Sequence, residues 1–89
     1  MALRKDRQRA IQIGERLKDA REAMSLTGPK VTQRKAAEYL GLKEETYRSY
    51  EYGRAELPEE IARKAAGFFG VDWRSFYEDS RPEMPPTLG

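Results

Sequence analysis

The sequence predicts a compact all-α domain built from five short helices. Apolar residues recur at spacings of three and four, which is the period of a helix with one buried face. Glycine and proline residues separate these stretches, and no stretch alternates apolar and polar residues as a half-buried strand does. With 89 residues, of which 38% are hydrophobic and 36% charged, the chain has the length and composition of one small soluble domain.

The first helix is expected at residues 8–25. Four apolar residues with spacings of 4, 3 and 4 form its inward face, namely Ile13, Leu17, Ala20 and Met24. The polar and basic segment from Met1 to Ala10 either frays or extends this helix. Thr27, Gly28 and Pro29 end it, because proline cannot continue the hydrogen-bond ladder.

The second and third helices are expected at 33–40 and 44–52. Thr32 can cap the second helix with its hydroxyl, and Gly41 suits its carboxyl end. The inward residues of the second helix are Ala36, Ala37 and Leu40. In the third helix, Tyr47 and Tyr50 point inward, whereas the tyrosines at 39 and 52 are expected on the surface or in an interface.

The last two helices are expected at 58–69 and 73–78. Pro58 suits a first helical position, and Asp72 can cap the fifth helix. Their apolar residues are Ile61, Ala65, Phe68, Phe69, Trp73, Phe76 and Tyr77. The expected organisation is a basic segment at 1–10, one helical domain at 11–79 and a proline-containing flexible tail at 80–89.

Residues 33–53 carry the most informative arrangement. Two short helices are joined by a turn of three or four residues that contains Gly41, and such a turn sets the helices crosswise. Ala37 leaves room where the helices cross, and Leu42 fills the corner. These features together predict a helix-turn-helix.

The same residues resemble the phage-repressor/Cro-type (XRE-like) helix-turn-helix DNA-binding family. The matching segments are Ile13–Arg21, Thr32-Gln33, Ala37–Leu42, Glu51–Gly53 and Phe69–Trp73. The resemblance implies a sequence-specific transcriptional regulator of the repressor/Cro type, with its third helix in the major groove. It also implies that Arg21 pairs with Glu51 in a partly buried ion pair, and that Gln33 contacts the DNA backbone.

The expected DNA-binding residues lie on and around the third helix. Lys43, Arg48 and Arg54 are candidates for phosphate contacts, although Arg48 could pair instead with Glu44 four residues earlier. Glu44, Glu45, Thr46 and Ser49 are candidates for base contacts, since a carboxylate can accept a hydrogen bond from cytosine N4. Thr46 and Ser49 could equally be ordinary surface residues.

The acidic start of the third helix leaves a second interpretation open. A carboxylate facing phosphates is repelled, so Glu44 and Glu45 would also suit an antitoxin-like or adaptor module that binds a basic protein. Residues 1–30 carry eight Lys and Arg against four Asp and Glu, which favours a polyanionic partner or is simply a solvated helix face.

The composition argues against a metal-binding protein, an enzyme and a membrane protein. The chain has no cysteine and no histidine, so the commonest metal ligands and the commonest general base are missing. No apolar run approaches the ~20 residues of a membrane span. We therefore expect a cytoplasmic, non-enzymatic protein without cofactor, metal or small-molecule substrate. We expect it to bind double-stranded DNA as a homodimer, because one recognition helix reads few base pairs.

Overall fold

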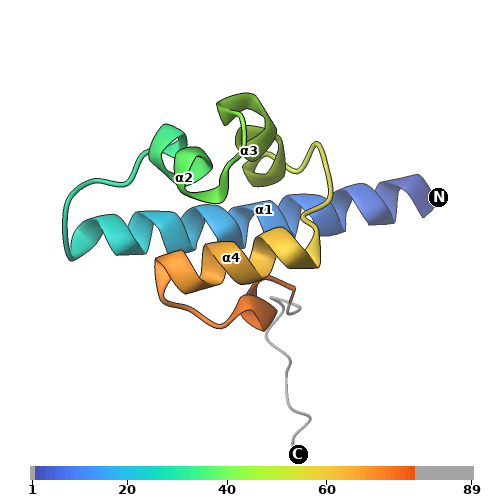
Figure 1. The fold of residues 1–89 in the computed structure, drawn as a ribbon. Helices are drawn as coiled ribbons and strands as arrows, with labels where there is room; N and C mark the ends of the chain where they lie inside the picture. Colours follow the sequence, from blue (N-terminus) through green and yellow to red (C-terminus); the bar gives the residue numbers. More distant parts are fainter. Residues whose placement is uncertain (1, 78–89) are drawn as a thin grey trace, which may run out of the picture.

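The computed structural model contains four α-helices and one short 3-10 helix. It describes residues 2–77, with side chains described from residue 8 onward. The elements are α1 (Ala2–Leu26), α2 (Gln33–Leu40), α3 (Glu44–Glu51), α4 (Glu59–Phe69) and the 3-10 helix η1 (Trp73–Phe76). In the view of Figure 1, α2 and α3 lie above the long α1, and α4 and η1 lie below and in front of it. Helix α4 also packs against α2, where the Tyr39 and Phe68 rings stack with their centroids 4.1 Å apart.

The all-α fold class is confirmed over the described residues, with three differences in detail. The fifth element is a 3-10 helix of four residues rather than an α-helix over 73–78, of which residue 78 lies outside the described part. Helix α1 begins at Ala2, so the basic segment extends the helix and projects past the other elements (Figure 1). Pro58 is the N-cap of α4 rather than its first helical residue.

The predicted division of the chain remains a prediction. Helix α1 continues without a break across residues 10 and 11, where the basic segment was expected to end. The predicted flexible tail at 80–89 falls outside the described residues.

The hydrophobic core draws on every element. Leu17 of α1, Tyr47 of α3 and Phe76 of η1 are the largest fully buried side chains. Around them lie Ile13, Val31, Ala36, Ala37, Leu40, Leu57, Ala62, Ala65, Ala66 and Phe69. Most of the residues predicted to point inward lie in the core. The others are only partly buried against it, namely Ala20, Met24, Tyr50, Ile61, Phe68, Trp73 and Tyr77. Tyr39 and Tyr52 are exposed, as predicted.

Helix α1 and the end of α3 approach each other at Gly14. A Cβ atom added to Gly14 would overlap the carbonyl oxygens of Tyr50 and Glu51. The missing side chain thus lets the two backbones touch. This contact fixes the carboxyl end of α3 against α1.

Candidate nucleic-acid interface

The turn between α2 and α3 is formed by local hydrogen bonds. The Thr32 hydroxyl accepts a hydrogen bond from the Lys35 amide (3.1 Å) and so caps the start of α2. At the other end Gly41 has a φ of 72°, and the Leu42 amide donates to the Ala37 carbonyl (2.9 Å). Leu42 then packs against the core, as a hydrophobic residue after this kind of cap usually does. The next residues start α3 in a fixed direction.

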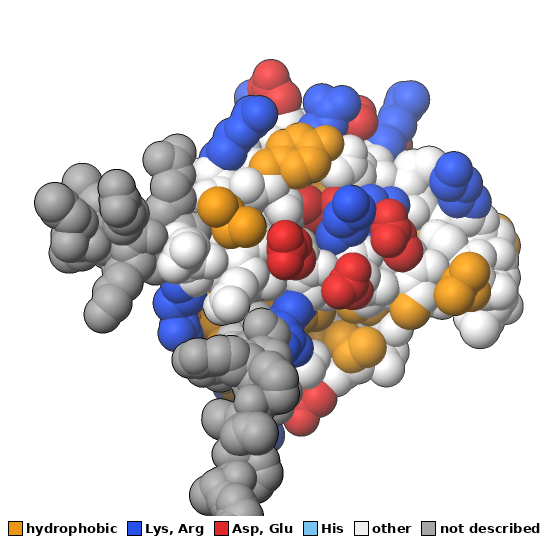
Figure 2. All heavy atoms as spheres, turned by 180° about the vertical axis from the view of Figure 1, so that it is seen from behind, with side chains coloured by type: hydrophobic (Ala, Val, Ile, Leu, Met, Phe, Trp, Pro, Cys, Tyr) orange, Lys and Arg blue, Asp and Glu red, His pale blue; other side chains and the backbone are white. Residues whose placement is uncertain are grey.

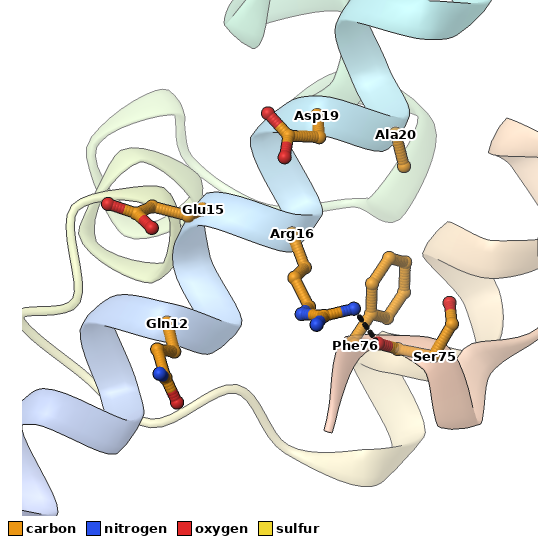
Figure 3. Close-up of a pocket in the computed structure, with 7 residues that line it drawn as sticks. All are labelled: Gln12, Glu15, Arg16, Asp19, Ala20, Ser75 and Phe76. Atoms are coloured by element: carbon orange, nitrogen blue, oxygen red, sulfur yellow. Dashed lines mark hydrogen bonds between the residues drawn. The ribbon is translucent and has the colours of Figure 1, made fainter. Parts of the chain in front are cut away.

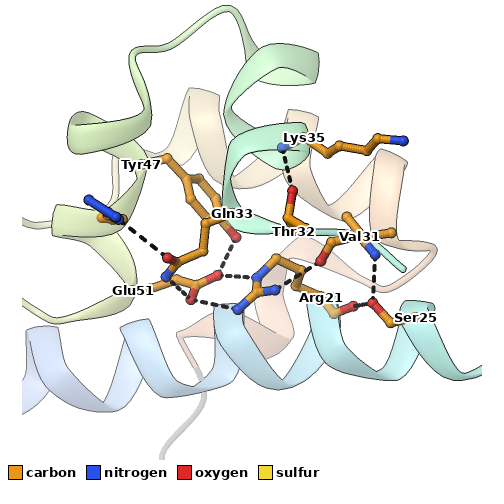
Figure 4. Close-up of polar contacts among 9 residues, drawn as sticks. Arg21, Ser25, Val31, Thr32, Gln33, Lys35, Tyr47 and Glu51 are labelled. Atoms are coloured by element: carbon orange, nitrogen blue, oxygen red, sulfur yellow. Dashed lines mark hydrogen bonds and ion pairs between the residues drawn. The ribbon is translucent and has the colours of Figure 1, made fainter. Parts of the chain in front are cut away.

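A buried cluster of polar side chains lies beneath α3 (Figure 4). The Glu51 carboxylate accepts hydrogen bonds from Arg21 Nε (2.7 Å) and Nη2 (3.2 Å), which form a two-point ion pair. It also accepts hydrogen bonds from Tyr47 Oη (2.6 Å) and Gln33 Nε2 (2.9 Å). Arg21 Nη1 donates to the Val31 carbonyl (2.9 Å). One carboxylate therefore connects α1, α2 and α3.

The ion pair between Arg21 and Glu51 confirms the pairing that the resemblance implied, and it is more deeply buried than expected. The Glu51 side chain is 0% exposed and the Arg21 side chain 11%. Burial acts to lower the pKa of Arg21, but the hydrogen bond and negative charge of Glu51 outweigh it and raise that pKa. Burial, together with the same carboxylate, raises the pKa of Tyr47 far above its usual value, so its hydroxyl stays protonated.

Two members of this cluster were not foreseen from the sequence. Tyr47 was expected in the core as a hydrophobic residue, yet its hydroxyl donates to Glu51. The spacing of four residues between them on one helix was the available signal. Gln33 was expected only at the surface, but its amide reaches Glu51 because α2 and α3 cross at this point. The loop before α2 is also held here, since the Val31 amide donates to Ser25 Oγ (2.8 Å).

A protein-family model described as Helix-turn-helix matches residues 29–76, which is more than half of the chain. The chain belongs to the XRE-like helix-turn-helix family. The matched segment contains α2, the turn, α3, α4 and η1, and so includes the crosswise helix pair. Members of this family bind DNA, and the chain is a DNA-binding regulator of the XRE type. No curated protein and no solved structure matches it.

A chain of polar contacts runs from the outer surface of α3 to the buried cluster. It joins Glu44, Arg48, Gln33 and Glu51 by one ion pair and two hydrogen bonds. Arg48 lies 3.7 Å from Glu44, so the alternative pairing considered from the sequence is present. Arg48 Nε also donates to Gln33 Oε1 (3.4 Å), and Gln33 in turn reaches the buried Glu51. Arg48 and Gln33 thus connect the surface of α3 to the buried cluster.

The other candidate residues of α3 differ in exposure. Lys43, the N-cap of α3, is exposed, as is Glu45, whereas Thr46 is half-buried. Ser49 is half-buried, and its Oγ donates to the Glu45 carbonyl (3.1 Å). The hydroxyl of Ser49 is therefore engaged with its own helix, whereas the Glu45 side chain extends from it.

Arg54 lies in the loop that follows α3. It is exposed, and its guanidinium carbon is 5.4 Å from the centroid of the Tyr52 ring. Seen from behind the view of Figure 1, charged side chains of both signs are interspersed over the surface (Figure 2). Among the described side chains of that face, neither sign forms a broad field that would attract or repel a polyanion.

A hollow of about 340 Å³ lies away from the helix-turn-helix, between α1 and η1 (Figure 3). Arg16 Nη1 donates there to the Ser75 carbonyl (3.1 Å) and ties η1 to α1. The lining residues are Gln12, Glu15, Arg16, Asp19, Ala20, Ser75 and Phe76. Among the described residues no group of acidic side chains could hold a metal ion, and no helix there is long and apolar enough to cross a membrane.

Proposed function

We propose that the chain is a sequence-specific transcriptional regulator of the repressor/Cro type that binds double-stranded DNA with α3 in the major groove. The observation that carries this proposal is the helix-turn-helix match over residues 29–76 together with the exposed outer surface of α3. A major groove about 12 Å wide admits one helix. The buried cluster supports the assignment, because it holds α3 in one orientation relative to α2.

Phosphate contacts would come from Gln33, Lys43, Arg48 and Arg54. The Gln33 amide nitrogen carries two hydrogens, so it can keep its hydrogen bond to Glu51 and still donate the second one to a phosphate. Arg48 has five N–H donors, so its contacts to Glu44 and Gln33 do not use all of them. Each cation that neutralises a phosphate adds about 0.9 to the slope of log K against log salt.

Base contacts would come from the start of α3. Glu44, Glu45, Thr46 and Ser49 lie there, and Glu45 is exposed without an ion pair to any described residue. A carboxylate in the groove is repelled by the phosphates and gains only where it accepts a hydrogen bond from an exocyclic amino group, as on cytosine N4. Glu45 therefore favours sites that place cytosine opposite it.

A homodimer acting in the cytoplasm completes the proposal. One recognition helix reads few base pairs, and two copies related by a two-fold axis read half-sites about 34 Å apart. The selected DNA sequence should accordingly contain an inverted repeat.

The test is a binding selection from random duplex DNA, run in parallel with the wild-type protein and Glu45→Gln. We expect an enriched sequence for the wild type and a changed preference at one base pair for the variant, with a loss of about 1–3 kcal/mol at that pair. Random-sequence affinity should rise modestly, because one negative charge is removed. Glu38→Gln is a control for the same charge change, since Glu38 is exposed on α2 and pairs with Arg34 there.

The acidic first turn of α3 favours one second candidate, a module that binds a basic protein partner. In that case neither protein would enrich a DNA sequence, and Glu44→Lys with Glu45→Lys would abolish capture of the partner. Binding to random duplex that does not depend on salt would also support the adaptor and contradict the DNA reader.

A further inference from the structure

A groove of about 540 Å³ lies on the side of the domain formed by η1 and the start of α4. Its apolar walls are Leu57, Pro58, Trp73 and Tyr77. The Tyr77 hydroxyl donates to the Leu57 carbonyl (2.8 Å), and the Trp73 and Tyr77 rings meet edge to face with their centroids 5.8 Å apart. These contacts hold the two aromatic side chains in place, so the groove is preformed.

The rim of the groove carries an available positive charge. The Arg74 guanidinium carbon lies 5.6 Å from the centroid of the Trp73 ring, and Arg74 makes no ion pair within the described part of the chain. Arg63 lies over the same ring at 4.5 Å, but it is held by Glu59 (2.8 Å). Glu56 and Glu59 also line the groove, and Glu59 is the residue paired with Arg63. An occupant that places an acidic residue beside Arg74 and an apolar segment between the rings would therefore complement the groove.

The chain itself supplies such a segment. Tyr77, which forms one wall, is the last described residue, and it is followed by Glu78–Gly89. This continuation contains Pro82-Glu83-Met84-Pro85-Pro86, a proline pair separated by two residues. In a polyproline II helix, with three residues per turn, Pro82 and Pro85 fall on the same face about 9 Å apart. Grooves lined by aromatic rings bind this kind of segment, because little conformational entropy is lost on binding.

We propose that residues 82–86 of the chain bind in the groove between Trp73 and Tyr77 of the same molecule, with Glu83 toward Arg74. The linker of residues 78–81 contains Asp79 and Ser80, which favour a reversal of the chain direction. The five steps along the chain from Tyr77 to Pro82 span at most about 17 Å, which suffices to return to a groove of which Tyr77 itself forms one wall.

The short linker gives the intramolecular contact an advantage. A segment held by a short flexible linker experiences an effective concentration of about 1 mM. If the free segment binds with a Kd of about 100 µM, its own copy occupies the groove about 90% of the time. A modest intrinsic affinity therefore keeps the groove occupied, and an added peptide must compete with the tethered segment.

Trp73 is the single tryptophan of the chain, so its fluorescence reports on this groove alone. The experiment measures acrylamide quenching of Trp73 in the wild type and in Pro82→Ala with Pro85→Ala, both as full-length chains. We expect quenching to increase about twofold in the double variant, because the ring becomes accessible. Pro86→Ala is the matched control: it lies on another face of the polyproline helix and should resemble the wild type. Circular dichroism checks that all three remain folded.

A competition experiment distinguishes binding of the segment within its own molecule from binding to a second molecule and from no binding. A synthetic peptide of residues 80–89 should shift Trp73 emission in the double variant, and the same shift in the wild type should need about tenfold more peptide. Equal peptide affinity for both proteins, or no binding to either, would overturn the proposal. Quenching of the wild type that changes with protein concentration would place the segment in a second molecule, which would also overturn it. This inference does not depend on DNA binding.

Discussion

Removing either partner of the ion pair between Arg21 and Glu51 should destabilise the domain strongly. Arg21→Ala leaves a fully buried carboxylate with two neutral donors, Tyr47 and Gln33, and no cation. Glu51→Ala leaves the Arg21 guanidinium with the Val31 carbonyl as its remaining acceptor in the cluster, and leaves the Tyr47 hydroxyl without its acceptor. A buried charge stripped of its partner typically costs about 3–5 kcal/mol. We expect each alanine variant to lose stability in this range.

The assay is urea unfolding followed by circular dichroism, with the midpoint and slope fitted separately. A domain of this size has about 5 kcal/mol in total, so Glu51→Gln serves as a milder variant if Glu51→Ala does not fold. The double variant Arg21→Ala with Glu51→Ala should lose less than the sum of the single losses, since neither charge is then left unpaired. The control is Glu38→Ala, which breaks an exposed pair with Arg34 (67% and 75% exposed) and should cost below about 0.5 kcal/mol. Losses below about 1 kcal/mol for both buried-pair variants, or strictly additive losses, would refute the reasoning.

Three further predictions concern other parts of the molecule. Because the pKa of Tyr47 is raised in the folded state, the stability it contributes is complete below the unfolded value of about 10 and declines above it by about 1.4 kcal/mol per pH unit. Urea unfolding at pH 8 and pH 11 should show this decline in the wild type and a smaller one in Tyr47→Phe; equal declines would contradict it. Gly14→Ala should cost about 2–3 kcal/mol or more because its methyl group meets backbone, whereas Gly67→Ala, in open space on α4, should stabilise by about 0.5–1 kcal/mol. Deleting residues 2–9 should flatten the salt dependence of DNA binding by about 0.9 for each phosphate that the segment neutralises, and an unchanged slope would show that this segment stays away from DNA.

The sequence predicted the parts of the fold that depend on local chemistry. Thr32 and Asp72 cap their helices as expected, because a side chain one residue before a helix reaches the free amide groups directly. The start of α1 was less predictable, since apolar spacing was the signal used and residues 2–9 offer little of it. The 3-10 form of η1 was missed for a similar reason. Four residues are too few for their spacing to distinguish the two kinds of helix.

The sequence predicted where the helix-turn-helix lies, but it did not predict which side chains of α2 and α3 contact one another. The turn at Gly41 located α3, and the resemblance paired Arg21 with Glu51. The contacts that Gln33 makes with Glu51 and Arg48 depend on the angle at which α2 crosses α3, which apolar spacing does not encode. A polar residue at the start of a helix looks the same in sequence whether it faces solvent or a buried carboxylate.

The contacts of Gln33 suggest how the domain links stability to recognition. A buried ion pair adds little net stability compared with a well-packed hydrophobic pair, but its hydrogen bonds are satisfied in few arrangements. Glu51 takes donors from α1, α2 and α3, so a shift of α3 along α2 would break at least one of them. Gln33 and Arg48 carry this constraint to the surface where DNA would bind. The orientation of α3 is thus set by a buried carboxylate beneath that surface. If α3 reads DNA as proposed, changes at Arg21 should alter DNA affinity even in variants that remain folded.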